Sequence, residues 1–130
     1  MAVFVADTHS LVWYFTGSAK LGQKALQAFR DASLGKGIIV VPTVVLAEIM
    51  DISEKKRMKV DYEELLERIE NSGNFEIYPL DVDVLRMARG ITSIPELHDR
   101  VIVATAKLLD AKLLTKDQNV QKSGVVEAIW

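Results

Sequence analysis

Two carboxylates in this sequence stand directly after short apolar runs. Asp7 ends the run Ala2–Asp7, and Asp117 follows Leu113–Thr115. Short apolar runs rich in β-branched residues are typical of strands buried on both faces of a parallel sheet. Ligands of open α/β sheets bind in the crevice beyond the carboxyl ends of the strands, so we expect both acids to enter one site. A local role stays open for each, because Asp7 could cap a helix and Asp117 could form a turn.

Two further carboxylates occur where the surrounding sequence is apolar. Glu48 lies inside a helical apolar run, where a charge needs an exposed face or a partner. It could form a surface ladder with Asp51 and Lys55, which share its helical face. Asp99 precedes another apolar run, and there it could simply favour the start of a helix through the helix dipole. In a doubly wound sheet, however, all four acids can converge on one crevice.

A group of carboxylates implies a particular chemistry. Packed together, they repel one another unless a cation joins them. With no cysteine in the chain and no histidine pair at helical spacing, oxygen ligands favour Mg²⁺ or Mn²⁺ over Zn²⁺. Such ions orient water and neutralise charge during phosphoryl transfer.

The elements that must position these acids alternate along the chain. Strands are predicted at Ala2–Asp7, Ile38–Val41, Phe75–Leu80, Lys112–Thr115 and, at an edge, Val125–Ile129. Helices are predicted at Ser10–Phe15, Ala19–Ala32 after an N-cap at Ser18, Val44–Glu54, Tyr62–Asn71, Val82–Arg89 and Leu97–Leu109, with a short helix or turn at Gln118–Lys122. This alternation predicts a three-layer α/β/α fold with a central parallel sheet.

Size and composition set the outer limits. The 130 residues are expected to form one domain, 1–130, and 49% hydrophobic with 26% charged residues is usual for a globular protein. No apolar run approaches the length of a membrane span, and the N-terminus lacks the basic region of a signal peptide. A cytoplasmic location is therefore predicted. A net charge of −2 gives no global attraction to nucleic acid.

Four short motifs in this order resemble the PIN domain family, and more closely the VapC toxins of prokaryotic toxin–antitoxin pairs. The motifs are Val5–His9, Leu46–Ile49, His98–Ala106 and Leu114–Asp117. The third, with Asp-Arg and an apolar run ending in Ala-Thr-Ala, is the most specific. The resemblance implies a Mg²⁺- or Mn²⁺-dependent ribonuclease that cleaves RNA, forms a homodimer and is inhibited by a small antitoxin protein.

By this resemblance, four residues match the family's acidic positions as catalytic residues and metal ligands: Asp7, Glu48, Asp99 and Asp117. Thr115 matches a frequent polar neighbour. Many relatives carry Asp-Pro before the acid of the third motif, whereas this chain has Glu96 and Leu97 there. This departure puts an outer-ligand role for Glu96 in doubt.

Other functions of α/β domains would require other motifs in this sequence. A dinucleotide-binding fold requires Gly-x-Gly-x-x-Gly after the first strand, and no glycine follows Asp7 before Gly17. A Mg²⁺-binding receiver domain is the stronger rival, although it would need paired acids after strand one. A non-catalytic PIN binding protein also stays open.

Several other polar and aromatic residues have ordinary explanations. His9, His98 and Arg100 flank the acids and could contact substrate, and the basic residues between Lys55 and Lys59 could meet phosphates or end a helix. The aromatic run Trp13–Phe15 is predicted to pack in the core or a dimer interface.

Overall fold

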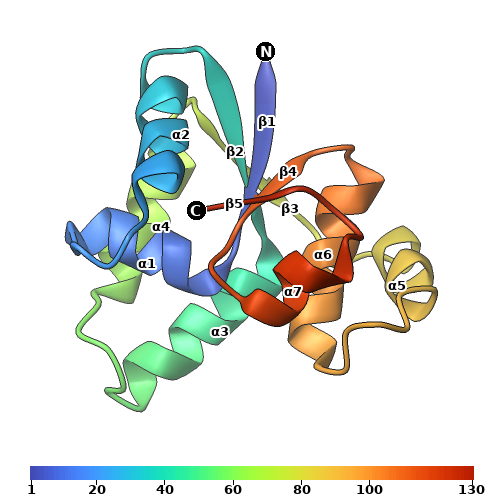
Figure 1. Ribbon diagram of the computed structural model, residues 1–130. Helices are drawn as coiled ribbons and strands as arrows, with labels where there is room; N and C mark the ends of the chain where they lie inside the picture. The colour runs from blue at the N-terminus through green and yellow to red at the C-terminus, as the bar shows by residue number, and fades with distance from the viewer.

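The computed structural model describes residues 1–130 and contains a five-stranded sheet in the order β3-β2-β1-β4-β5. Every neighbouring pair of strands is parallel. The strands are β1 (Ala2–Ala6), β2 (Gly37–Pro42), β3 (Phe75–Tyr78), β4 (Lys112–Leu114) and β5 (Ala128–Ile129). Figure 1 shows β1 in the middle of the sheet, so the first strand is flanked on both sides.

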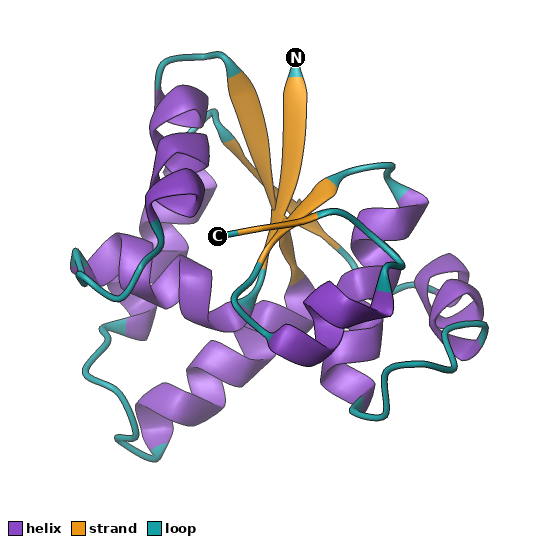
Figure 2. Cartoon of the chain, in the orientation of Figure 1, coloured by secondary structure: helices purple, strands orange, loops and turns teal.

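Helices cover both faces of this sheet (Figure 2). They are α1 (Thr8–Thr16), α2 (Gln23–Ser33), α3 (Thr43–Glu54), α4 (Tyr62–Asn71), α5 (Val82–Arg89), α6 (Leu97–Leu108) and α7 (Gln118–Ser123). In Figure 1, α1, α2 and α4 lie to one side of the sheet, and α5 and α6 lie to the other. Helix α3 contacts α1, α4 and α6, and so links the two helical layers. The predicted three-layer α/β/α architecture is confirmed.

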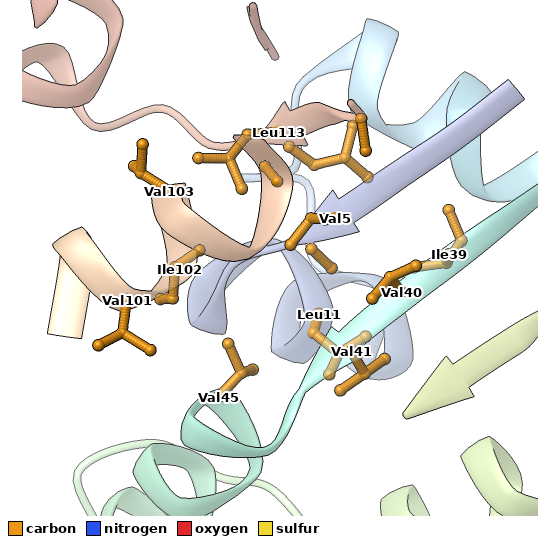
Figure 3. Packing of buried hydrophobic residues seen from close by; sticks show 14 of the residues in the cluster. Val5, Leu11, Ile39, Val40, Val41, Val45, Val101, Ile102, Val103 and Leu113 are labelled. Atoms are coloured by element: carbon orange, nitrogen blue, oxygen red, sulfur yellow. The ribbon is translucent and has the colours of Figure 1, made fainter. Parts of the chain in front are cut away.

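The core lies between the central strands and the helices beside them. Val5 of β1, Ile39 of β2 and Leu113 of β4 are buried, and Figure 3 shows them packed with Leu11 and Val103 from helices on either side. The strands are apolar on both faces because both faces are covered, as expected for a parallel sheet. This rigid centre fixes the points at which β1 and β4 end.

The predicted helix Ala19–Ala32 was wrong at its start. Helix α2 begins at Gln23 with Gly22 as its N-cap, while the Ser18 hydroxyl accepts a hydrogen bond from the Lys20 N–H within a turn. A Cβ at residue 22 would stand 2.5 Å from the backbone carbon of Trp130. The absence of a side chain at Gly22 therefore allows the start of α2 to lie close to Trp130.

The predicted strand Phe75–Leu80 was too long. Strand β3 ends at Tyr78, because the N–H of Leu80 donates to the Thr43 hydroxyl at 3.0 Å instead of continuing the sheet. Asp81 then caps α5 through the Val84 N–H at 2.9 Å. No helix of the structure has the length and apolarity needed to cross a membrane.

Candidate active site

Asp7 follows β1 and begins α1. Its Oδ1 accepts a hydrogen bond from the Ser10 N–H at 2.9 Å, so the predicted capping role is confirmed. Burial raises the pKa of this carboxyl, an effect partly offset by the Thr115 hydroxyl and by Ser10. The cap does not remove Asp7 from the site, since it engages only one carboxylate oxygen and the side chain still lines a cleft at the sheet edge.

Asp117 occupies the corresponding place after β4. Its Oδ1 accepts from the Val120 N–H at 3.0 Å and thereby caps α7, while its own N–H donates to the Thr115 hydroxyl at 3.1 Å. Because β1 and β4 are parallel neighbours, with Ala6 beside Leu114, the two acids emerge at the same edge. The two aspartates therefore hold two helix starts and face one cleft.

Glu48 reaches the same cleft from α3. Its Oε1 accepts a hydrogen bond from the buried Thr8 hydroxyl at 3.0 Å. Burial is the main cause of the raised pKa of Glu48, and Thr8 acts against it. The alternative surface ladder forms only in part, because Lys55 pairs with Asp51 at 3.1 Å while Glu48 turns to α1.

Asp99 lies in the first turn of α6. Its pKa is raised to about 6, first by burial and then by the negative charges of Asp117, Glu96, Glu48 and Asp7. The charges of the other three acids predicted from the sequence therefore all act on Asp99. Negative charge gathered around one carboxylate favours the binding of a cation.

These four acids line one cleft of about 270 Å³ at the carboxyl ends of β1 and β4. Its other lining residues are Thr8, His9, Ile102 and Lys116. Sequence reasoning did not assign a role to Thr8 or Lys116. A signal existed for both, since each stands beside a strand-end aspartate.

The donor chemistry of the cleft suits a hard divalent cation, because four carboxylates line it and none of them forms a salt bridge. The side chains as they stand are spread out, and no three Asp, Glu or His residues converge closely enough to ligate one ion. Asp7, Glu48 and Asp117 each already accept a hydrogen bond through one carboxylate oxygen. Each leaves a second carboxylate oxygen that a cation could recruit.

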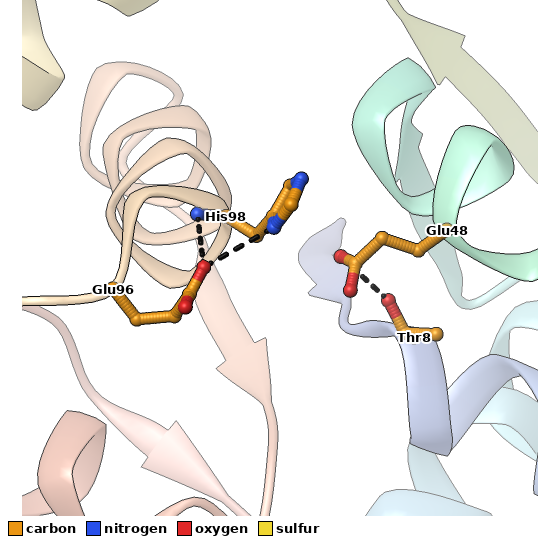
Figure 4. A network of polar contacts seen from close by, with 4 residues as sticks. All are labelled: Thr8, Glu48, Glu96 and His98. Carbon is orange, nitrogen blue, oxygen red and sulfur yellow. Dashed lines mark hydrogen bonds and ion pairs between the residues drawn. The ribbon is translucent and has the colours of Figure 1, made fainter. Parts of the chain in front are cut away.

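A larger groove of about 680 Å³ adjoins the cleft and shares His9 and Glu48 with it. His98 and Arg57 also line this groove. Figure 4 shows that the His98 ring is held by Glu96, whose Oε1 lies 3.1 Å from Nδ1 and also accepts from the His98 N–H. The groove therefore extends from the acidic cleft to residues near the end of α3.

Arg100, the neighbour of Asp99, does not line the cleft. Its Nε is buried and has no hydrogen-bond partner. No side chain that lines the acidic cleft has a buried nitrogen or oxygen atom without a hydrogen-bond partner.

The fold matches several solved structures. A chain of the VapBC2 complex from Rickettsia felis, bound to a DNA fragment, aligns with a TM-score of 0.73 and 16% identity over 98% of this chain and 97% of that one. VapBC-5 from Mycobacterium tuberculosis aligns with a TM-score of 0.62 and 21% identity over 99% and 98%. VapC20 from the same organism, described as a sarcin–ricin loop cleaving toxin, gives 0.68 and 15% over 97% and 98%.

Sequence comparison assigns the family directly. No curated protein sequence matches this chain. A family model described as the PIN domain matches residues 4–124, which run from within β1 to just past α7 and include all four acids. The chain belongs to the PIN domain family.

Proposed function

We propose that this protein is a divalent-metal-dependent endoribonuclease and the toxin of a type II toxin–antitoxin pair. The observation that carries the proposal is the cleft lined by Asp7, Glu48, Asp99 and Asp117, in which burial and then neighbouring negative charges raise the pKa of Asp99 to about 6. Membership of the PIN domain family and the likeness in fold to VapC proteins support it.

The four carboxylates would hold Mg²⁺ or Mn²⁺. When bound, such an ion supplies positive charge beside the scissile phosphate and makes water a better nucleophile. The chain itself orients the acids, because Asp7 and Asp117 are fixed by the helices they cap and Glu48 by the Thr8 hydroxyl. The buried apolar layer behind them, including Ile102, excludes water from one side of the site.

Cleavage of total RNA tests the proposal. We expect wild-type protein to cleave RNA with Mg²⁺ and to stop with EDTA, and we expect Asp99→Asn to be inactive. Asp83→Asn is the matched control, because Asp83 is an exposed acid on α5 outside the cleft. Equal cleavage by the wild type and Asp99→Asn would overturn the assignment.

A non-catalytic PIN binding protein is the second candidate. It is favoured by one observation, namely that three of the four acids already make hydrogen bonds and no three converge on a metal position. The same assay separates the two, since a binding protein would leave RNA intact under every metal condition.

We also propose an antitoxin partner whose arginine or lysine enters the acidic cleft, replaces the cation's charge and blocks substrate. Solved neighbours include VapBC toxin–antitoxin complexes. Co-purification from the native host is the test. A small companion protein whose release restores cleavage would support the proposal, and an active protein without a companion would contradict it.

A homodimer is proposed from the exposed apolar side chains of α5. Val82 and Leu85 share one helical face and are 59% and 48% exposed. Exposed apolar patches commonly mark protein contacts. Light scattering should give a dimer mass for the wild type and a monomer mass for Leu85→Lys; a wild-type monomer at micromolar concentration would refute the dimer.

A further inference from the structure

Lys116 is a cation at the edge of an acidic cleft, yet it pairs with none of the acids. It lines the cleft beside Asp7, Asp99 and Asp117. None of the four salt bridges in the structure includes it. The strongest influences on the pKa of Asp99 are burial and negative charges, with no cation among them. The Lys116 ammonium is therefore held away from the carboxylates.

The group that holds it is the indole of Trp13. The Lys116 Nζ lies 4.6 Å from the ring centroid, which is a cation–π distance. Trp13 is only 6% exposed and is braced by the rings of His9 at 5.2 Å and Trp130 at 5.8 Å. The ring is consequently a fixed support for the ammonium and is too buried to stack on a nucleotide base.

A second ammonium approaches the same ring. The Lys20 Nζ lies 5.8 Å from the Trp13 centroid, and Lys20 also belongs to no salt bridge. Two cations at one ring, neither of them in a salt bridge, repel each other and attract an external anion. A nucleic acid strand entering the cleft brings such anions at every nucleotide.

We propose that Lys116 binds an RNA phosphate next to the scissile one, with Trp13 as the positioning residue that aims its ammonium. This inference rests on the proposed ribonuclease function and assigns one side of its substrate path. Because the Lys116 ammonium lies against Trp13 and pairs with none of the acids, it is placed for a neighbouring phosphate and not for the reacting one. The strand would then leave the cleft over α1, past Lys20.

The first experiment measures binding without cleavage. A short fluorescein-labelled single-stranded RNA of mixed sequence is titrated with protein in EDTA at several salt concentrations. Loss of one phosphate contact should reduce the slope of log K against log salt by about 0.7 for Lys116→Met. Lys116→Arg should keep the slope. Lys112→Met is the matched control, because Lys112 is an exposed lysine at the other end of β4, paired with Glu127, and should also keep it.

The second experiment measures cleavage kinetics with Mg²⁺. Lys116→Met should raise KM about 5–10-fold with kcat little changed, because a flanking contact binds ground state and transition state alike. Trp13→Phe keeps an aromatic ring but a weaker cation–π partner, so it should raise KM by a smaller factor. In the double variant Trp13→Phe should add nothing, whereas a purely structural effect of the ring would persist.

The outcomes distinguish failure of the proposed role of Lys116 from failure of the proposed ribonuclease function. Wild-type protein that neither binds nor cleaves RNA would overturn the ribonuclease proposal and this inference with it. Active wild type, with an unchanged salt slope and KM for Lys116→Met, would overturn only the role of Lys116. A fall in kcat at constant KM would also overturn it, since Lys116 would then act on the reacting phosphate.

Discussion

The four acids of the cleft fall into two pairs that are built differently. The strand-end pair, Asp7 and Asp117, each hold the first turn of a helix through Oδ1. The helix-borne pair, Glu48 and Asp99, project from α3 and α6 and cap neither helix. The strand-end pair therefore holds the backbone of two helix starts as well as contributing charge to the cleft, whereas the helix-borne pair contributes charge without capping a helix. Substitutions should separate these roles.

The largest stability difference is expected within the strand-end pair. Asp7→Asn keeps a good N-cap and removes a buried charge, so it should raise stability without metal. Asp7→Ala loses the cap and should be about 1–2 kcal/mol less stable than Asp7→Asn. Urea unfolding in EDTA measures both. Asp99→Asn and Asp99→Ala should differ by much less, and an equal gap at both positions would abolish the distinction between the pairs.

Mg²⁺ should stabilise the wild type more than it stabilises an Asn variant of either pair. At ten times Kd, a bound ion adds about 1.4 kcal/mol, or a melting shift of about 3–5 °C. Asp7→Asn and Asp99→Asn should respond less, because each lacks one ligand charge. Thermal melts with EDTA and with Mg²⁺ supply the comparison, and an equal shift in all three proteins would mean that the metal binds elsewhere.

One part of the pH dependence of stability should belong to Asp99 of the helix-borne pair. The pKa of Asp99 is raised from 3.8 to about 6, so its protonated form favours the folded state. This contribution is complete below about pH 4 and is lost as pH rises through about 6. After allowance for solvent screening at this partly exposed group, the change is ~1 kcal/mol. Asp99→Asn should flatten that part of a metal-free stability profile; a profile identical to that of the wild type would disprove the assignment.

The smallest effect on stability and cleavage is expected for Asp51, which lies one turn along α3 from Glu48. Asp51 and Lys55 form an exposed ion pair, which typically contributes less than about 0.5 kcal/mol. Asp51→Asn should therefore change neither unfolding nor cleavage appreciably, whereas Glu48→Gln should eliminate cleavage. Parallel assays of the two variants test whether cleavage depends on an acid that contacts Thr8 and lines the cleft, or on any negative charge on this face of α3.

The sequence was sufficient to predict the parallel sheet, both helical layers and the cleft-facing positions of the acids. These follow from local signals, since apolar runs, caps and strand ends are visible in the residues themselves. The start of α2 could not be predicted in this way, because Gly22 is selected by contact with Trp130 at the far end of the chain. The double use of Asp7 was similarly hidden, since capping and cleft lining were treated as alternatives. The support of Lys116 by Trp13 also depends on tertiary contact alone.

The central place of β1 has a consequence for the newly made chain. Its Val5 pairs with Val40 of β2, which is made soon after β1, but on the other edge Val5 pairs with Leu113 of β4, which is made much later. Contacts between residues so distant in sequence form late and slow the folding of the whole domain core. Until the ribosome has released that segment, β1 keeps an open edge and Asp117 is missing. A nascent fragment that ends before Asp117 lacks one of the four acids, so the cleft is completed only after β4 and the residues that follow it have left the ribosome.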